Sequence, residues 1–148
     1  MKAPTPSPHA NSANCPECGG PQADGFSCWG LLGAVIAWEM YDADLQAEHF
    51  KIVASYNLQH PAQFHADPLA DLQAAYIEQI DLGLPASQIR KRMGGAFEGE
   101  RRVLKDPAER QPVLRTWKMT IADVYAHGQA EGAAQRVRQW AASLRAEL

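Results

Sequence analysis

The chain has 148 residues, of which 46% are hydrophobic and 21% are charged. This length suits one domain with a real core, and the composition argues against wholesale disorder, a collagen-like repeat or a polyelectrolyte. Residues 1–81 hold 2 basic and 10 acidic residues, a balance of −8, whereas residues 82–148 hold 12 basic and 7 acidic residues, a balance of +5. The two parts either attract each other within one domain or offer a basic face to an acidic partner.

Residues 1–14 are predicted to be a disordered tail, since prolines alternate there with small polar residues. The tail has no apolar stretch of the kind that a secretory signal needs, so we expect a cytoplasmic protein. No apolar run in the chain reaches the roughly 18 residues that span a bilayer, so we expect no membrane partner. The remaining residues, 15–148, are expected to form a single zinc-stapled helical domain.

Helical periodicity dominates the chain from residue 28 onward, and no strand-like alternation extends beyond a few residues. Capping residues, apolar spacing and terminal glycines or prolines mark the ends of the expected helices. These helices run over 28–40, from 42 or 44 to 58, over 67–83, over a short stretch after 87, over 120–128 and over 131–148. We therefore predict an all-α fold, a compact bundle of four or five helices with an N-terminal zinc-knuckle loop. The four tryptophans are expected to lie mostly in its core.

A Cys-Pro-Glu-Cys-Gly-Gly motif at 15–20 is the most specific local signal in the chain. Two thiolates separated by two residues bind one ion, because the turn between them points both sulfur atoms inward. Glycine after the second cysteine permits that turn and leaves backbone N–H groups free to bond to the sulfurs. The pattern is typical of zinc knuckles in ribbon-type zinc proteins, and it predicts a structural zinc ion.

The other two ligands are predicted from their position on the helices. Cys28 begins a helix, where the N-terminal dipole favours a thiolate. If the first two helices form an antiparallel hairpin, the end of the second lies beside the start of the first, which places His60 near Cys28. The alternative fourth ligand is His49, which lies on the apolar stripe of its helix and is otherwise a core residue. The predicted set is Cys15, Cys18, Cys28 and His60.

Several motifs of the chain occur together in one known family. They are the CPECG string at 15–19, Cys28, His49 and a YNLQHP string at 56–61. This combination resembles an uncharacterised bacterial family, a domain of unknown function, and the segments 120–124 and 137–141 are similar to that family's closing part. The resemblance implies a small compact protein whose signature is the cysteine pair, a third cysteine and two histidines. It implies no activity.

Three interpretations of the function remain open, and no catalytic motif assigns a substrate or a reaction. We favour a structural-zinc module that interacts with another protein or with a second copy of itself. A zinc ion with an open coordination position would instead support a hydrolase-like enzyme. The third interpretation is a nucleic-acid-binding module that uses the basic segment 90–118. Its expected contacts are Arg90, Lys91, Arg92, Arg101, Arg102 and Trp117.

Overall fold

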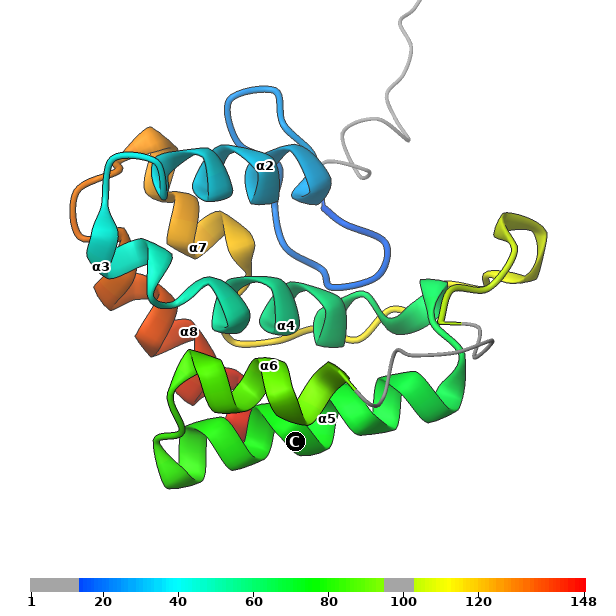
Figure 1. The fold of residues 1–148 in the computed structure, drawn as a ribbon. Helices are drawn as coiled ribbons and strands as arrows, with labels where there is room; N and C mark the ends of the chain where they lie inside the picture. The colour runs from blue at the N-terminus through cyan, green and yellow to red at the C-terminus, as the bar shows by residue number, and fades with distance from the viewer. Residues whose placement is uncertain (1–13, 95–102) are drawn as a thin grey trace, which may run out of the picture.

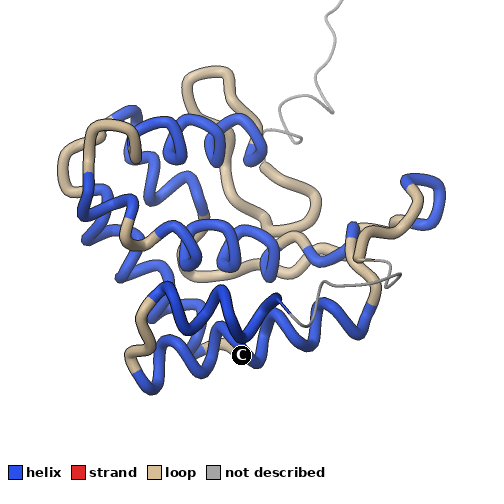
Figure 2. The backbone as a smooth tube through the Cα atoms, in the orientation of Figure 1, coloured by secondary structure: helices blue, strands red, loops and turns tan. Residues whose placement is uncertain are grey.

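The computed structural model describes residues 14–94 and 103–148, and this part of the chain is helical (Figure 2). Seven α-helices lie in the described ranges, and in the same ranges the only β pairing consists of isolated bridges. The helices are α2 (Cys28–Trp38), α3 (Ala43–Gln46), α4 (His49–Gln59), α5 (Ala66–Leu82), α6 (Ala86–Gly94), α7 (Ile121–Tyr125) and α8 (Ala133–Ala146). The all-α prediction is confirmed, with more helices than the four or five expected. The predicted tail lies outside the described residues, apart from Asn14, which forms a β-bridge with Pro21.

One helix more than the six predicted ranges arises where a predicted helix is interrupted. The expected helix from residue 42 or 44 to 58 is two helices, because Glu48 has φ −98° and ψ 12°, which breaks the helical path between α3 and α4. The Asp42 carboxylate caps α3 by accepting a hydrogen bond from the backbone N of Leu45 at 3.0 Å. Gly83 ends α5 in the left-handed conformation, at φ +65°, as its position in the sequence predicts.

The helices α2 and α4 run antiparallel, with the short α3 at the turn between them (Figure 1). In this arrangement α7 packs against α2, and α5 and α6 lie together on the far side of α4. The last helix, α8, packs against α3, α4, α5 and α7, so it joins both sides of the molecule. The hairpin of α2 and α4 brings the start of one helix close to the end of the other.

Two clusters of buried apolar side chains form the core. The first joins α2, α7 and the first half of α8 with residues of α3 and α4, and it includes Cys18 and Cys28. The second joins α4, α5, α6 and the second half of α8. Trp140 is fully buried in the first cluster, whereas Trp29 has 71% of its surface exposed. The prediction that the tryptophans are mostly core residues is therefore wrong for Trp29, which is largely exposed at the first turn of α2.

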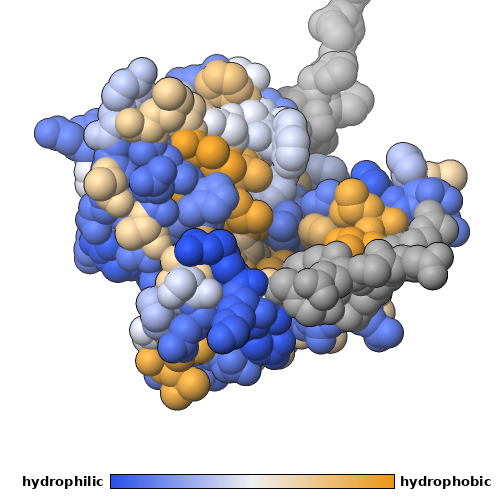
Figure 3. Space-filling view, viewed as in Figure 1, coloured by the Kyte–Doolittle hydropathy of each residue, from blue (hydrophilic) through white to orange (hydrophobic). Residues whose placement is uncertain are grey.

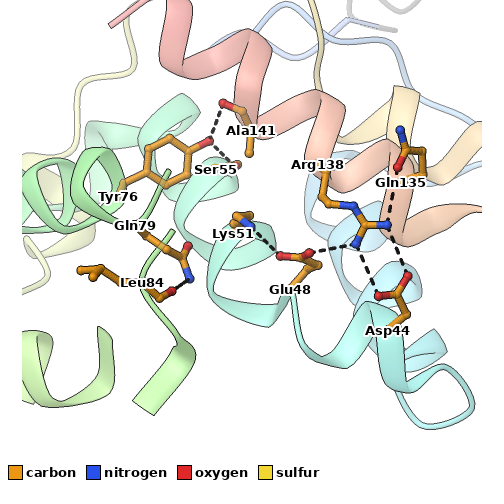
Figure 4. A network of polar contacts seen from close by, with 10 residues as sticks. All are labelled: Asp44, Glu48, Lys51, Ser55, Tyr76, Gln79, Leu84, Gln135, Arg138 and Ala141. Atoms are coloured by element: carbon orange, nitrogen blue, oxygen red, sulfur yellow. Dashed lines mark hydrogen bonds and ion pairs between the residues drawn. The ribbon is translucent and has the colours of Figure 1, made fainter. Parts of the chain in front are cut away.

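Residues of the acidic and basic parts of the chain pair within the molecule (Figure 4). Arg138 on α8 donates to Glu48 at 2.9 Å and to Asp44 at 3.3 Å. Arg145, also on α8, donates to Asp81 at 2.9 Å. These ion pairs show that the acidic and basic parts of the chain attract each other, in part, within one structure. None of the helices in 14–94 and 103–148 has the length and apolar character that crossing a membrane requires.

Candidate metal centre

The three cysteines and one histidine converge at the open end of the α2–α4 hairpin. Cys15 and Cys18 lie in the loop before α2, Cys28 is the first residue of α2, and His60 follows the last residue of α4. One ligand atom from each of the four residues lies within 4.8 Å of each of the others. This arrangement is close enough to hold a metal ion, and it brings together the four residues that the sequence predicts.

The loop that carries the first two cysteines is a tight turn closed by its own backbone. The Cys15 N donates to the Gly20 carbonyl at 2.7 Å, and the Gly19 N donates to the Cys15 carbonyl at 2.9 Å. Gly19 has φ +76°, a left-handed conformation that a side chain would strain. Three backbone N–H groups point at sulfur: those of Glu17 and Cys18 lie 3.4 Å from Cys15 Sγ, and that of Gly20 lies 3.3 Å from Cys18 Sγ. Such bonds stabilise thiolates and orient them as ligands.

The imidazole of His60 is oriented by a backbone group of its own helix. Its Nδ1 lies 2.7 Å from the carbonyl oxygen of Tyr56, and a carbonyl only accepts, so Nδ1 carries the proton. In the neutral imidazole the lone pair is therefore on Nε2, which lies 3.5 Å from Cys15 Sγ. The ring is also stacked on Tyr56, with centroids 4.0 Å apart. Backbone hydrogen bonding of one ring nitrogen is the usual support for a histidine that ligates through the other.

The crowding of these groups changes their acidity. The Sγ atoms of Cys18 and Cys28 lie 3.6 Å apart, and a hydrogen bond from the Cys28 thiol lowers the pKa of Cys18 to about 4, against the opposing effect of burial. The same bond, together with burial, raises the pKa of Cys28. Burial lowers the pKa of His60, but hydrogen bonds to Cys18 and to the Tyr56 carbonyl outweigh it and raise the pKa to about 9. Thiols that share protons in this way bind a cation readily, because the ion replaces those protons.

The alternative ligand, His49, is not part of this group. It is the first residue of α4, at the opposite end of the helix from His60, and its side chain is 52% exposed. Its Nδ1 lies 2.7 Å from Glu39 Oε2, which makes it an ion-pair partner when it is protonated. The expectation that His49 lies on a buried stripe assumed one continuous helix, and the break at Glu48 removes that continuity.

The residues expected to contact nucleic acid are only partly described. Arg90, Lys91 and Arg92 are exposed on α6, and Arg92 pairs with Glu78 at 3.5 Å. Arg101 and Arg102 lie outside the described residues. Trp117 is half-buried and packs against both core clusters. The guanidinium of Arg115 lies 3.8 Å from the Trp117 ring centroid, so one face of the indole expected to stack on a base is already covered.

Two residues that position the loop were not singled out in the sequence. Glu17 occupies the unspecified position of the CPxC motif, and its carboxylate accepts a hydrogen bond from the backbone N of Ala62 at 2.7 Å, just after His60. Gly20 lies so close to Thr120 that an added Cβ would be 2.5 Å from the threonine Oγ1. The Gly-Gly pair in the sequence could have indicated this close approach. A single glutamate in a loop gives no indication of its role.

Comparison with known proteins places this arrangement in a family. The pattern of a family of unknown function (DUF5946) matches residues 13–148, which include all four converging residues. The chain belongs to this family. The match agrees with the resemblance seen in the sequence, and like that resemblance it assigns no activity. Neither the curated proteins nor the solved structures give a match to the chain.

Proposed function

We propose that the chain is a zinc-binding helical protein in which Cys15, Cys18, Cys28 and His60 coordinate one structural Zn²⁺ ion. The observation that carries the proposal is the spacing of the ligand atoms. Tetrahedral zinc with ordinary Zn–S and Zn–N bonds separates two sulfurs by about 3.8 Å and a sulfur and a nitrogen by about 3.6 Å. The Cys18–Cys28 sulfur pair is 3.6 Å apart, and Cys15 Sγ is 3.5 Å from His60 Nε2.

The chemistry of the donors favours zinc over other ions and over a disulfide. Thiolate and imidazole ligands in a tetrahedral set suit zinc, whereas magnesium and calcium prefer oxygen. The three cysteines are unbridged, and a separation of 3.6 Å is far from the roughly 2.05 Å of a disulfide bond. Four protein ligands also fill a tetrahedral shell, which leaves no position for a reactive water. The geometry therefore supports a structural ion rather than the hydrolase-like alternative.

The ion would staple the loop 14–27 to the ends of α2 and α4. Apolar packing alone holds this loop weakly, since Cys18 and Gly20 are its only buried residues. We propose that the stapled domain serves as a protein-interaction module. One segment of the described chain with exposed apolar side chains contains Leu104, Val113 and Leu114, which are 49%, 75% and 60% exposed. Figure 3 shows apolar surface on the side of the molecule where residues 103–114 lie.

The metal content of purified protein tests the zinc proposal. We expect one zinc per chain in the wild type, and a loss of at least tenfold in zinc affinity for His60→Ala, because removing a ligand opens the shell. His49→Ala is the matched control, since it removes a histidine from the other end of the same helix, and it should retain full zinc. An unchanged zinc affinity in His60→Ala, or a loss of zinc in His49→Ala, would contradict the assignment.

The interaction surface is tested by sedimentation of the zinc-loaded protein. We propose a second copy of the chain as the partner. Association should then increase with protein concentration, and Leu114→Asp should abolish it. Tyr41→Asp is the control, because Tyr41 is 89% exposed and lies at the α2–α3 turn, away from residues 103–114. A strictly monomeric wild type would rule out self-association through this surface.

A further inference from the structure

A small cavity adjoins the proposed zinc centre. It has a volume of about 220 Å³, and Cys15, Cys28 and His60 line it, whereas Cys18 lies behind it, fully buried. Sites for drug-sized molecules have volumes of roughly 300–1,000 Å³, so this cavity suits a single compact group. It also exceeds what a metal ion between the four ligands would fill, because Trp29 and Tyr56 extend its walls beyond the centre.

Aromatic rings form two walls of the cavity. Trp29 and Tyr56 meet edge to face, with centroids 6.1 Å apart and planes inclined by 60°. Tyr56 in turn stacks on His60 with planes only 20° apart, so its orientation is coupled to the metal centre. Trp29 is held open to solvent at the first turn of α2, with 71% of its surface exposed. Tyr56 is only 5% exposed and stacks on His60, but both rings line the cavity. Two inclined rings that border one cavity resemble part of an aromatic cage, which binds cations through the negative faces of the rings.

The charge of the metal centre adds to this preference. A Zn²⁺ ion with three thiolates and a neutral imidazole carries a net charge of −1, and Cys15 and Cys28 bring that charge to the cavity wall. The described residues that line the cavity include no lysine and no arginine that would offset this charge. The N-terminus of α2 favours anions, but the adjacent thiolates already compensate for its partial positive charge.

We propose that this cavity binds a quaternary ammonium group between Trp29, Tyr56 and the metal-bound cysteines. The inference rests on the proposed zinc centre for the negative charge and on the two rings for the shape. A methylated ammonium suits the site better than a primary one. The described lining contains no carboxylate that would form an ion pair with an NH₃⁺ group, its amide and hydroxyl side chains are neutral, and methyl groups make good contact with ring faces.

The test compares choline with its neutral carbon analogue, in which a tert-butyl group replaces the trimethylammonium group. Both are titrated into the full chain after its zinc content is measured, and binding is followed by the NMR signal of the Trp29 indole N–H. We expect choline to bind about fivefold tighter or more than the neutral analogue, since cation–π attraction supplies this difference. Trp29→Leu should abolish the preference. Tyr41→Leu, which removes another exposed aromatic ring at the far end of α2, should leave it unchanged.

Each outcome distinguishes the two proposals. Equal affinity for choline and the neutral analogue in zinc-loaded protein, or no binding of either, would overturn the ammonium site and leave the zinc centre intact. Displacement of choline by sulfate through Trp29 would likewise overturn it, because the site would then favour anions. Protein that carries no zinc would overturn both proposals. Tighter binding of ethanolamine than of choline would show that the site selects a primary ammonium and would overturn the stated preference.

Discussion

The loop 14–27 and the helix pair α5–α6 are held in place by different forces. In the loop, most side chains are exposed, and the contacts that organise it are hydrogen bonds to sulfur and to backbone groups. In α5 and α6, apolar side chains such as Leu72, Ile89 and Met93 are buried against α4 and α8. The proposed metal ion would hold the first region, whereas the hydrophobic effect holds the second, so loss of that ion should disrupt the loop far more than the two helices.

The largest expected effect comes from removing the most buried ligand. Cys18→Ser should abolish stoichiometric zinc binding and open the loop 14–27, because zinc contributes about 10–16 kcal/mol to the folding of zinc-finger peptides. Hydrogen exchange of the loop amides should rise strongly, while exchange in α5 and α6 should change little. Chelation of zinc from the wild type should reproduce this pattern. Unchanged exchange in the loop after chelation would show that zinc does not hold it.

A substitution in the second core cluster should have the opposite pattern. Leu144 on α8 is 1% exposed in this cluster, and Leu144→Ala should lower the free energy of unfolding by about 2–5 kcal/mol. Urea unfolding measures this loss, and metal analysis of the folded variant should still give one zinc per chain. A loss of zinc in this variant would mean that the two regions are not independent.

A polar contact inside the second region allows a finer comparison (Figure 4). The Tyr76 hydroxyl is 2.7 Å from Ser55 Oγ and donates to the Ala141 carbonyl at 3.3 Å, joining α5 to α4 and α8. Tyr76→Phe should cost about 1–3 kcal/mol, because it leaves buried partners unsatisfied. Tyr41→Phe, on an 89% exposed residue, is the matched control and should be neutral in the same urea titration. Equal effects in the two variants would show that the buried network adds no stability.

The smallest expected effect is electrostatic and depends on pH. Burial raises the pKa of Glu48, but its bonds with Lys51 and Arg138 outweigh this and lower the pKa below its ordinary value of 4.5. A lowered pKa in the folded state means that these ion pairs stabilise the fold above pH 4.5 and cease to do so as the pH falls through the lowered value. Glu48→Gln should therefore cost less than about 1 kcal/mol at pH 7 and nothing at strongly acid pH. A cost that grows toward acid pH would contradict this sign.

Most of the candidate metal centre could be predicted from the sequence. The CPECG string predicts the turn, and hairpin geometry correctly places His60 beside Cys28. The prediction failed where tertiary packing decides the path of a helix or the direction of a side chain. The break between α3 and α4 has no glycine or proline to mark it, so His49 was expected on a buried stripe. Trp29 was expected in the core because its apolar character is visible in the sequence, whereas the direction in which it points is not.

X-ray absorption at the zinc edge of the purified full chain tests the central claim most directly. We expect one zinc per chain with three sulfur ligands at about 2.3 Å and one nitrogen ligand at about 2.0 Å. The nitrogen contribution should disappear or be replaced by oxygen in His60→Ala and persist in His49→Ala. A metal-free protein, or a wild-type zinc shell containing fewer than three sulfurs, would contradict the account.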